Sequence, residues 1–178
     1  AAHASDAGDF VAADSGQQAK LLEAWAAQPD PARVELINSL QQGQITVDGE
    51  TKTLRLNNRL RGLVDTALAS HQLLAADAKL RLGAAQHLQK SAKPAQLKFL
   101  DRQLASETNA DVHTALSLAL ANLQLVDGDP AVRLAAVRLL GETGDPLART
   151  RLETLLDPAV ETDAGVRTAA ETSLAQVK

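Results

Sequence analysis

The stretch DPAVRLAAVRLLGETGDPLARTRLETLLDP, residues 129–158, decides the fold class of this chain. It contains two short amphipathic segments, each opened by Asp-Pro and separated by a glycine-containing turn. An aspartate at a helix N-cap accepts hydrogen bonds from the unpaired amides of the first turn, and proline suits the first helical position because no N–H is needed there. The stretch therefore predicts two consecutive helices.

The opening of this stretch recurs in the chain as an internal repeat. Four predicted helix starts align on Leu80, Val112, Val132 and Val166, each expected to be the first core residue of its helix. Each start has an Asp or Asn cap three positions earlier, a basic residue one position later, mostly small residues at +3 and +4, and leucine at +8. Because small residues let a neighbouring helix approach closely, the pattern predicts helix stacking. The caps and the arginine ladder are Asp77, Arg81, Asn109, Asp129, Arg133, Asp163 and Arg167, with His113 in the arginine position of the second repeat.

The repeat leaves two questions open. Its arginines could line a concave site for an acidic partner, but their fixed position favours a structural ladder with the capping aspartates. The repeat spacings are 32, 20 and 34 residues, and only the two longer ones fit a helix pair of HEAT or armadillo type. Either the helices at 110–126 and 130–142 form one hairpin, or a partner helix is missing between them.

Composition agrees with a helical fold. Of the 178 residues 45% are hydrophobic but only 2% are aromatic, so leucine, alanine and valine must build the core, and the first two are strong helix formers. The net charge of −4 argues against nucleic acid as a partner. The absence of cysteine excludes disulfides and thiol nucleophiles.

The rest of the chain reads as further helices and one hairpin. Hydrophobic periodicity predicts an antiparallel helix pair over 17–28 and 31–42, and a β-hairpin near 44–56 turns at Asp48-Gly49. Residues 1–16 are expected to be a flexible segment. The remaining helices are predicted near 57–74, 77–90, 94–105, 110–126, 130–142, 145–156 and 163–177.

These elements predict an all-α, HEAT-like helical-repeat solenoid of about nine helices with one small inserted hairpin. We expect residues 17–178 to form a single domain. Such arrays present a long surface suited to protein contacts rather than one deep pocket.

Three features together resemble a known family. They are the segment DPAVRLAAVRLLGETGDP (129–146), the segment RLNNRLR (55–61) and the N-terminal helix pair followed by a hairpin. Along the chain they follow the order helix pair, hairpin, RLNNRLR and repeats, and in that order they resemble the extracytoplasmic N-terminal region of the permease B subunit of urea ABC transporters, in the branched-chain amino-acid transporter permease group. The resemblance runs from about Asp9 to Lys178.

The resemblance implies a non-catalytic protein-interaction domain in the periplasm, tethered in the full-length protein to the inner membrane. Its implied partners are the periplasmic urea-binding protein and the membrane portion of the same permease.

Ala2-His3-Ala4 has the form of a signal-peptide end, and the lack of methionine indicates a processed or excised piece. No stretch is apolar enough for this fragment to insert into a membrane. The alternatives are a HEAT-like enzyme subunit of the chromophore-lyase type and a purely structural or dimerisation domain.

One polar cluster is a candidate partner-binding site. Asn57, Asn58, Arg59 and Arg61 lie where the hairpin passes into a helix, and arginine offers a planar fork of donors for a partner. The alternative, which we favour, is that an asparagine caps the helix and the arginines pair with carboxylates such as Asp65.

Catalytic and metal sites are not expected. The four histidines, at positions 3, 71, 87 and 113, show no metal-ligand spacing, and no cofactor is predicted. There is no nucleophile elbow, phosphate-binding loop or dinucleotide fingerprint, so the sequence predicts that the chain is not an enzyme. Trp25 lies on a leucine-rich helical stripe and is expected in the core.

Overall fold

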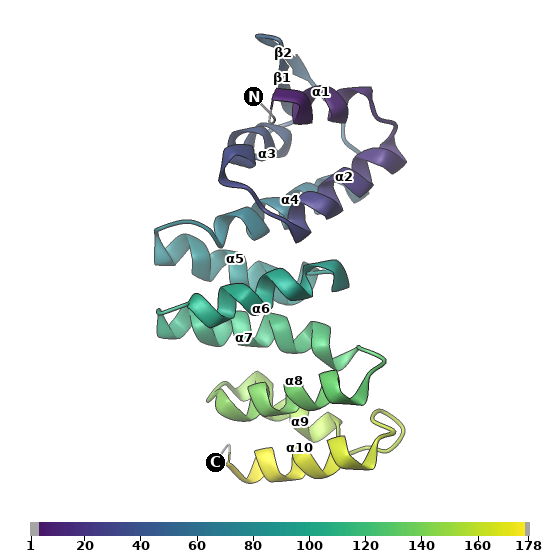
Figure 1. The fold of residues 1–178 in the computed structure, drawn as a ribbon, viewed down its shortest axis with the longest axis vertical. Coiled ribbons are helices and arrows are strands. Elements are labelled where there is room, and N and C mark those ends of the chain that lie inside the picture. Colours follow the sequence, from purple (N-terminus) through teal and green to yellow (C-terminus); the bar gives the residue numbers. More distant parts are fainter. Residues whose placement is uncertain (1–3, 177–178) are drawn as a thin grey trace. The chain divides into compact units, whose positions relative to one another are not determined.

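The computed structural model describes residues 4–176, which form ten α-helices and a two-stranded hairpin (Figure 1). The predicted mostly helical fold with one small hairpin is confirmed. The chain divides into two compact units, unit 1 up to Ser91 and unit 2 from Ala92, whereas the sequence pattern predicts a single domain over 17–178.

In unit 1, helix α4 is central because α2, α3 and α5 all pack against it. Its core is built from leucine, alanine, valine and isoleucine together with the rings of Phe10 and Trp25. The elements of unit 1 are α1 (Ala4–Ala12), α2 (Ser15–Ala27), the 3-10 helix η1 (Pro31–Arg33), α3 (Val34–Gln41), β1 (Gln44–Val47), β2 (Glu50–Thr53), α4 (Asn58–Gln72) and α5 (Ala78–Ser91).

Helix α1 is the one helix that the sequence pattern did not predict. It lies within residues 1–16, which were expected to form a flexible segment. It is anchored by Phe10, which is fully buried with its ring centroid 5.9 Å from that of Trp25. Arg33 stacks over the Trp25 ring at 5.2 Å and donates to the Asp6 carboxylate at 3.2 Å. The sequence concealed this helix because its anchoring contacts come from residues that follow it in the chain. Trp25 is 5% exposed, so its predicted core position is confirmed.

The N-terminal helices do not pair as predicted. Both α2 and α3 pack mainly against α4, which arrives from beyond the hairpin, rather than against each other. Asp30 caps η1 through the Ala32 amide, and this extra turn separates the two helices. The short connection between α2 and α3 therefore did not make these two helices pack against each other.

The hairpin forms where Asp48-Gly49 predicts it. Asp48 and Gly49 have φ values of 52° and 81°, the left-handed conformations that a two-residue hairpin turn requires. Antiparallel pairing joins Gln44 to Thr53 and Val47 to Glu50. Ile45 is fully buried and joins the hairpin to the core of unit 1.

In unit 2, helix α8 packs between α7 and α10, while α6 lies on α7 and α9 contacts α8 and α10. Direct packing of α7 on α8 shows that these two helices form one hairpin across the shortest repeat spacing. Gly141 permits a close approach of α8 to α10, because a Cβ at this position would lie 3.0 Å from the Ser173 Cβ. The elements of unit 2 are η2 (Pro94–Gln96), α6 (Leu97–Ser106), α7 (Ala110–Leu125), α8 (Pro130–Glu142), α9 (Pro146–Thr154) and α10 (Ala164–Gln176).

Candidate functional site

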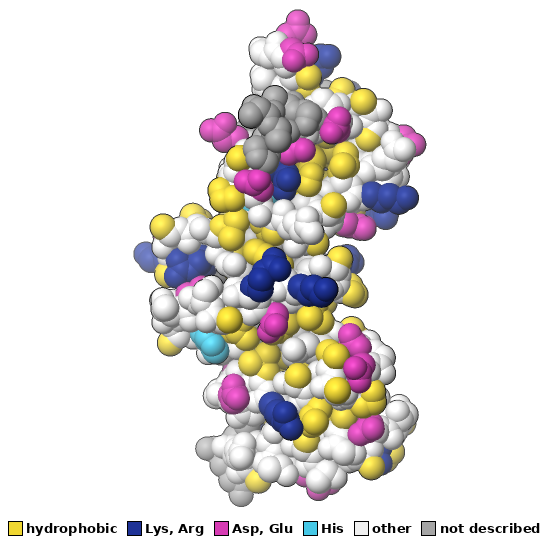
Figure 2. Space-filling view, viewed as in Figure 1, with side chains coloured by type: hydrophobic (Ala, Val, Ile, Leu, Met, Phe, Trp, Pro, Cys, Tyr) yellow, Lys and Arg dark blue, Asp and Glu magenta, His cyan; other side chains and the backbone are white. Residues whose placement is uncertain are grey.

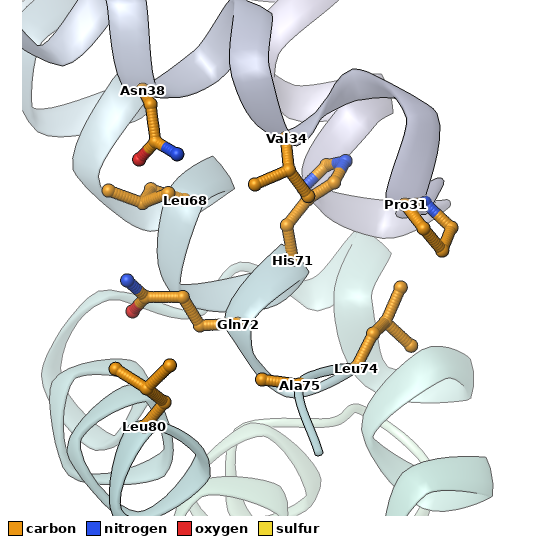
Figure 3. Close-up of a pocket in the computed structure, with 9 residues that line it drawn as sticks. All are labelled: Pro31, Val34, Asn38, Leu68, His71, Gln72, Leu74, Ala75 and Leu80. Carbon is orange, nitrogen blue, oxygen red and sulfur yellow. The ribbon is translucent and has the colours of Figure 1, made fainter. Parts of the chain in front are cut away.

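Residues of three helices of unit 1 line a largely apolar pocket of about 330 Å³ that is open to solvent (Figure 3). Val34 of α3, Leu68 of α4 and Leu80 of α5 line it, together with Leu74 just after α4. Leu80 is 48% exposed and Leu74 is 36% exposed, so two large aliphatic side chains remain accessible to a ligand.

A second hollow of about 410 Å³ adjoins the first and has a more polar lining. The two hollows share Asn38, Leu68 and Gln72, and the second adds Gln41, Asp65 and His87 among its lining residues. We call the two together the α4 groove. It has an apolar end near Leu80 and a polar end near Asp65.

Helical periodicity explains why these residues share one groove. On α4, Asp65, Leu68, Ala69 and Gln72 follow the spacing of a single helix face and form the floor. Residues 34, 38 and 41 of α3 form one wall at the same type of spacing, and residues 80, 83, 84 and 87 of α5 form the other. Gly83 leaves that wall open, since a Cβ there would meet no atom within 4 Å.

The groove contains two carboxamides without an intramolecular partner in the described part of the chain. The side chains of Asn38 and Gln72 lie on the same side of the pocket, with Leu68 between them (Figure 3). Farther along, the Gln41 side chain donates to the Asp65 carboxylate at 3.4 Å. Since a carboxamide both donates and accepts, Asn38 and Gln72 can bind a ligand that presents both kinds of group.

His71 also borders the pocket, but both of its ring nitrogens are used within the fold. Nε2 accepts the Asp30 backbone N–H at 3.2 Å, so the Nδ1–H donates to the Ala67 carbonyl oxygen at 2.7 Å. The ring is 2% exposed, and burial lowers the pKa of the imidazole below its ordinary value of 6.5, opposed by the Ala67 hydrogen bond. The nearby Arg33 cation lowers this pKa further, and the Asp30 carboxylate raises it. His71 is therefore a neutral structural residue that ties α4 to the start of η1.

The predicted cluster at the start of α4 does not form one site. Asn57 caps α4 by accepting the Leu60 N–H at 2.8 Å, which confirms the predicted asparagine cap, and Asn58 is exposed in the first turn. Arg59 lies 4.0 Å from Glu23 of α2, with both side chains well exposed. Arg61 is exposed and two positions farther on, about 200° around the helix from Arg59, so the two arginines face different directions.

Asp65 is not the arginine partner that the sequence suggested. Its carboxylate accepts a hydrogen bond from the Gln41 amide of α3, because α3 packs along this face of α4. Arg61 and Asp65 nevertheless lie four positions apart on α4, on one helix face. Of the predicted cluster, Arg61 is thus the residue placed on the stripe that leads into the α4 groove.

All four predicted repeat caps make capping hydrogen bonds. Asp77 accepts the Lys79 N–H, Asn109 those of Asp111 and Val112, Asp129 that of Ala131 and Asp163 that of Val166. Each such cap contributes about 1 kcal/mol to helix stability.

The three repeat arginines share a contact that the sequence did not predict. Each donates to the carbonyl oxygen six residues earlier, in the loop before its own helix: Arg81 to Ala75, Arg133 to Asp127 and Arg167 to Glu161. Arg133 also forms a bidentate pair with the buried Glu161 carboxylate, at 2.8 and 2.9 Å. The common role of the repeat arginines is therefore to bind the preceding loop.

Comparisons of the chain with protein-family models, curated proteins and solved structures found no match. Within residues 4–176, no group of histidine and acidic side chains has the arrangement of a metal site, and His3 lies outside this range. No helix in the same range has the length and apolar character needed to cross a membrane. On the face drawn in Figure 2, basic side chains are interspersed with acidic ones, in keeping with the modest net charge.

The α4 groove is the feature that the sequence did not reveal. Leu80 was expected in the core at the first repeat position, where Val112 and Val166 are indeed buried, but it is half-exposed. Leu80 lies in the first turn of α5, on the same helix face as the buried Ala84 and Leu88, but it borders the open pocket that α3 and α4 also line. Asn38 and Gln72 have the appearance of ordinary surface amides in sequence, since only the packing of α3 on α4 places them together.

Proposed function

We propose that this chain is a non-catalytic, HEAT-like protein-interaction domain that binds its partner through the α4 groove. The groove itself is the observation that carries this proposal. It exposes aliphatic side chains beside carboxamides that have no partner among the residues the structure describes, and such a surface gains both apolar burial and hydrogen bonds when a partner covers it.

The repeat supports the HEAT-like part of the proposal. Helices α5, α8 and α10 each begin at a capping aspartate and carry an arginine bound to the preceding loop. In helical-repeat proteins, each unit buries an apolar face against its neighbour and presents the remaining surface to partners. The same aspartate cap and the same arginine–loop contact occur in all three helices, as expected for such an array.

The resemblance to the urea transporter permease supplies the proposed context. We place the domain in the periplasm, ahead of the membrane portion of such a permease, where it would dock the urea-binding protein and so orient it over the channel. Contact with the membrane portion of the same permease is the second partner interaction that this position implies. The roles of Arg59 and Arg61 as partner contacts are part of the same proposal.

Calorimetric titration of the purified chain with a periplasmic urea-binding protein, with and without saturating urea, tests this function. We expect binding in the micromolar range that strengthens when the receptor is loaded with urea. A transient interface of this kind is small and partly polar. Absence of heat at high concentrations of both proteins would contradict the docking role and favour a structural role for the domain.

A further inference from the structure

We infer that the α4 groove binds an extended peptide segment that carries an aliphatic side chain and, three or four residues away, a lysine or arginine. The inference rests on the proposed docking function and names the chemistry of the segment that is bound.

The apolar end fits an aliphatic side chain. Val34 of α3, Leu68 of α4 and Leu80 of α5 line it, and Leu80 has half of its surface exposed. The volume of about 330 Å³ lies at the lower end of the range of about 300–1,000 Å³ that is usual for ligand pockets. Both His71 ring nitrogens are already bonded, so this end offers apolar contact, with no charged group among its lining residues.

The middle of the groove fits a polypeptide backbone rather than a helix. Asn38 projects from the α3 wall and Gln72 from the α4 floor, and neither carboxamide has an intramolecular partner in the described structure. A bound helix would have satisfied its own backbone groups and could not use them. An extended segment presents free N–H and C=O groups, which carboxamides bind in both directions.

The polar end fits a basic side chain. Asp65 supplies a carboxylate there, half-buried and bonded to the Gln41 amide only at 3.4 Å, and no lysine or arginine lines either hollow. A lysine or arginine in the ligand would complete the hydrogen bonds of this carboxylate through a charge-assisted contact. The local charge therefore complements a basic residue and disfavours an acidic one.

The separation of the two ends sets the spacing in the ligand. From Asp65 to Gln72, the last residue of α4, is seven residues, which corresponds to about 10 Å at about 1.5 Å per helical residue. Leu74 and Ala75 line the apolar end just after the helix, so the groove continues past this point. An extended chain covers about 3.3 Å per residue, so three or four residues of ligand span the groove.

The experiment selects ligands from a random ten-residue peptide library on the immobilised chain, then measures the strongest peptide by fluorescence anisotropy. We expect the selected sequences to share an aliphatic residue and a basic residue three or four positions apart. Leu80→Glu should weaken binding by about tenfold or more, because it places a carboxylate in the apolar end. Asp65→Asn should weaken the same peptide, but not a version in which its basic residue is replaced by glutamine.

Leu147→Glu is the matched control, because Leu147 is 50% exposed in unit 2, nearly the same as Leu80. It should leave peptide binding unchanged, and thermal unfolding followed by Trp25 fluorescence shows that each variant keeps unit 1 folded. Selected peptides without the aliphatic and basic pattern, failure to select any peptide, or binding that survives Leu80→Glu would overturn the inference.

The two proposals can fail separately. If the urea-binding protein binds and Leu80→Glu has no effect on that binding, docking stands and the groove is not its site. If peptides bind as expected but the urea-binding protein gives no heat, the ligand chemistry stands and the proposed transporter function does not.

Discussion

His71 shows how one buried side chain connects sequence-distant segments in unit 1. Its ring joins the last turns of α4 to the Asp30 amide, forty-one residues earlier in the chain. The neighbouring charged groups are Arg33 and Asp30, and Arg33 is itself bonded to Asp6 of α1. A second proton on this ring would face an N–H donor, so the fold requires neutral histidine.

We therefore expect unit 1 to lose stability in mild acid. Because the folded state lowers the pKa of His71, the unfolded chain binds the proton more readily below the ordinary value of 6.5. The free energy of unfolding should fall as the pH drops below 6.5, until the lowered pKa of the folded state is passed. Urea unfolding followed by Trp25 fluorescence at a series of pH values measures this dependence.

The variant His71→Gln removes the titrating group and tests its contribution. It should cost on the order of 1 kcal/mol at pH 7.5 through a lost or distorted hydrogen bond, and it should flatten the dependence between pH 7 and 5. His113→Gln changes an exposed histidine in unit 2 and should leave the Trp25 transition as it is. An unchanged pH dependence in His71→Gln would assign the acid sensitivity to other groups.

At the scale of elements, the loop-binding arginines define how consecutive repeat helices are joined. The Arg133 guanidinium reaches both the loop before α8, through the Asp127 carbonyl, and the loop before α10, through Glu161. Glu161 also accepts the Asp163 N–H, and its own carbonyl accepts from Arg167. The hydrogen bonds from Arg133 hold the pKa of Glu161 below its ordinary value of 4.5 and raise the pKa of Arg133.

Glu161→Gln is expected to destabilise unit 2 by on the order of 2 kcal/mol at neutral pH, because it replaces a buried charge-assisted pair by a neutral amide. Since the folded pKa of Glu161 is lowered, its stabilisation is present above pH 4.5 and is lost as the pH falls through the folded value. The difference between the native chain and the variant should therefore shrink below pH 4.5. Thermal unfolding followed by circular dichroism measures both effects.

Glu153→Gln provides the matched control for that experiment. Glu153 also pairs with an arginine, Arg149, at 3.1 Å, but both side chains are more than half exposed. Exposed pairs contribute little, so this variant should change stability by less than about 0.5 kcal/mol. Equal effects of the two variants would show that the Arg133–Glu161 pair has no special structural role.

At the scale of the whole molecule, each unit contains its own cluster of buried hydrophobic residues. The core of unit 1 is formed by residues from Ala7 to Leu68, and the α8–α10 core of unit 2 by residues from Leu118 to Ala170. The single tryptophan of the chain, Trp25, belongs to the first. Its fluorescence reports on unit 1, whereas circular dichroism reports on the helices of both units.

A division into two compact units predicts two unfolding events. In a urea titration, the Trp25 fluorescence transition and the circular dichroism transition should not coincide, because domains with separate cores can unfold at different denaturant concentrations. Glu161→Gln should shift the circular dichroism curve and leave the fluorescence midpoint unchanged. Coincident transitions that move together in this variant would contradict the prediction and indicate one cooperative unit.

Much of the local structure was predictable because its causes are local. The caps at Asp77, Asn109, Asp129 and Asp163 accept amides two or three residues away, so a short sequence window contains both partners. The Asp48-Gly49 turn is equally local, since it needs only two residues that tolerate positive φ. Seven predicted helices between residues 57 and 177 accordingly begin and end close to the observed positions.

The sequence alone thus determined the helical class, the hairpin, the helix caps and the repeat. Tertiary structure decided what depends on distant residues: the anchoring of α1 by Trp25, the partner of Arg133, the neutral state of His71 and the exposure of Leu80. The α4 groove belongs to this second group, because its walls and floor come from three helices whose packing is set by long-range burial. Helix periodicity shows which residues share a face, but only the packed neighbours decide whether that face is covered or open.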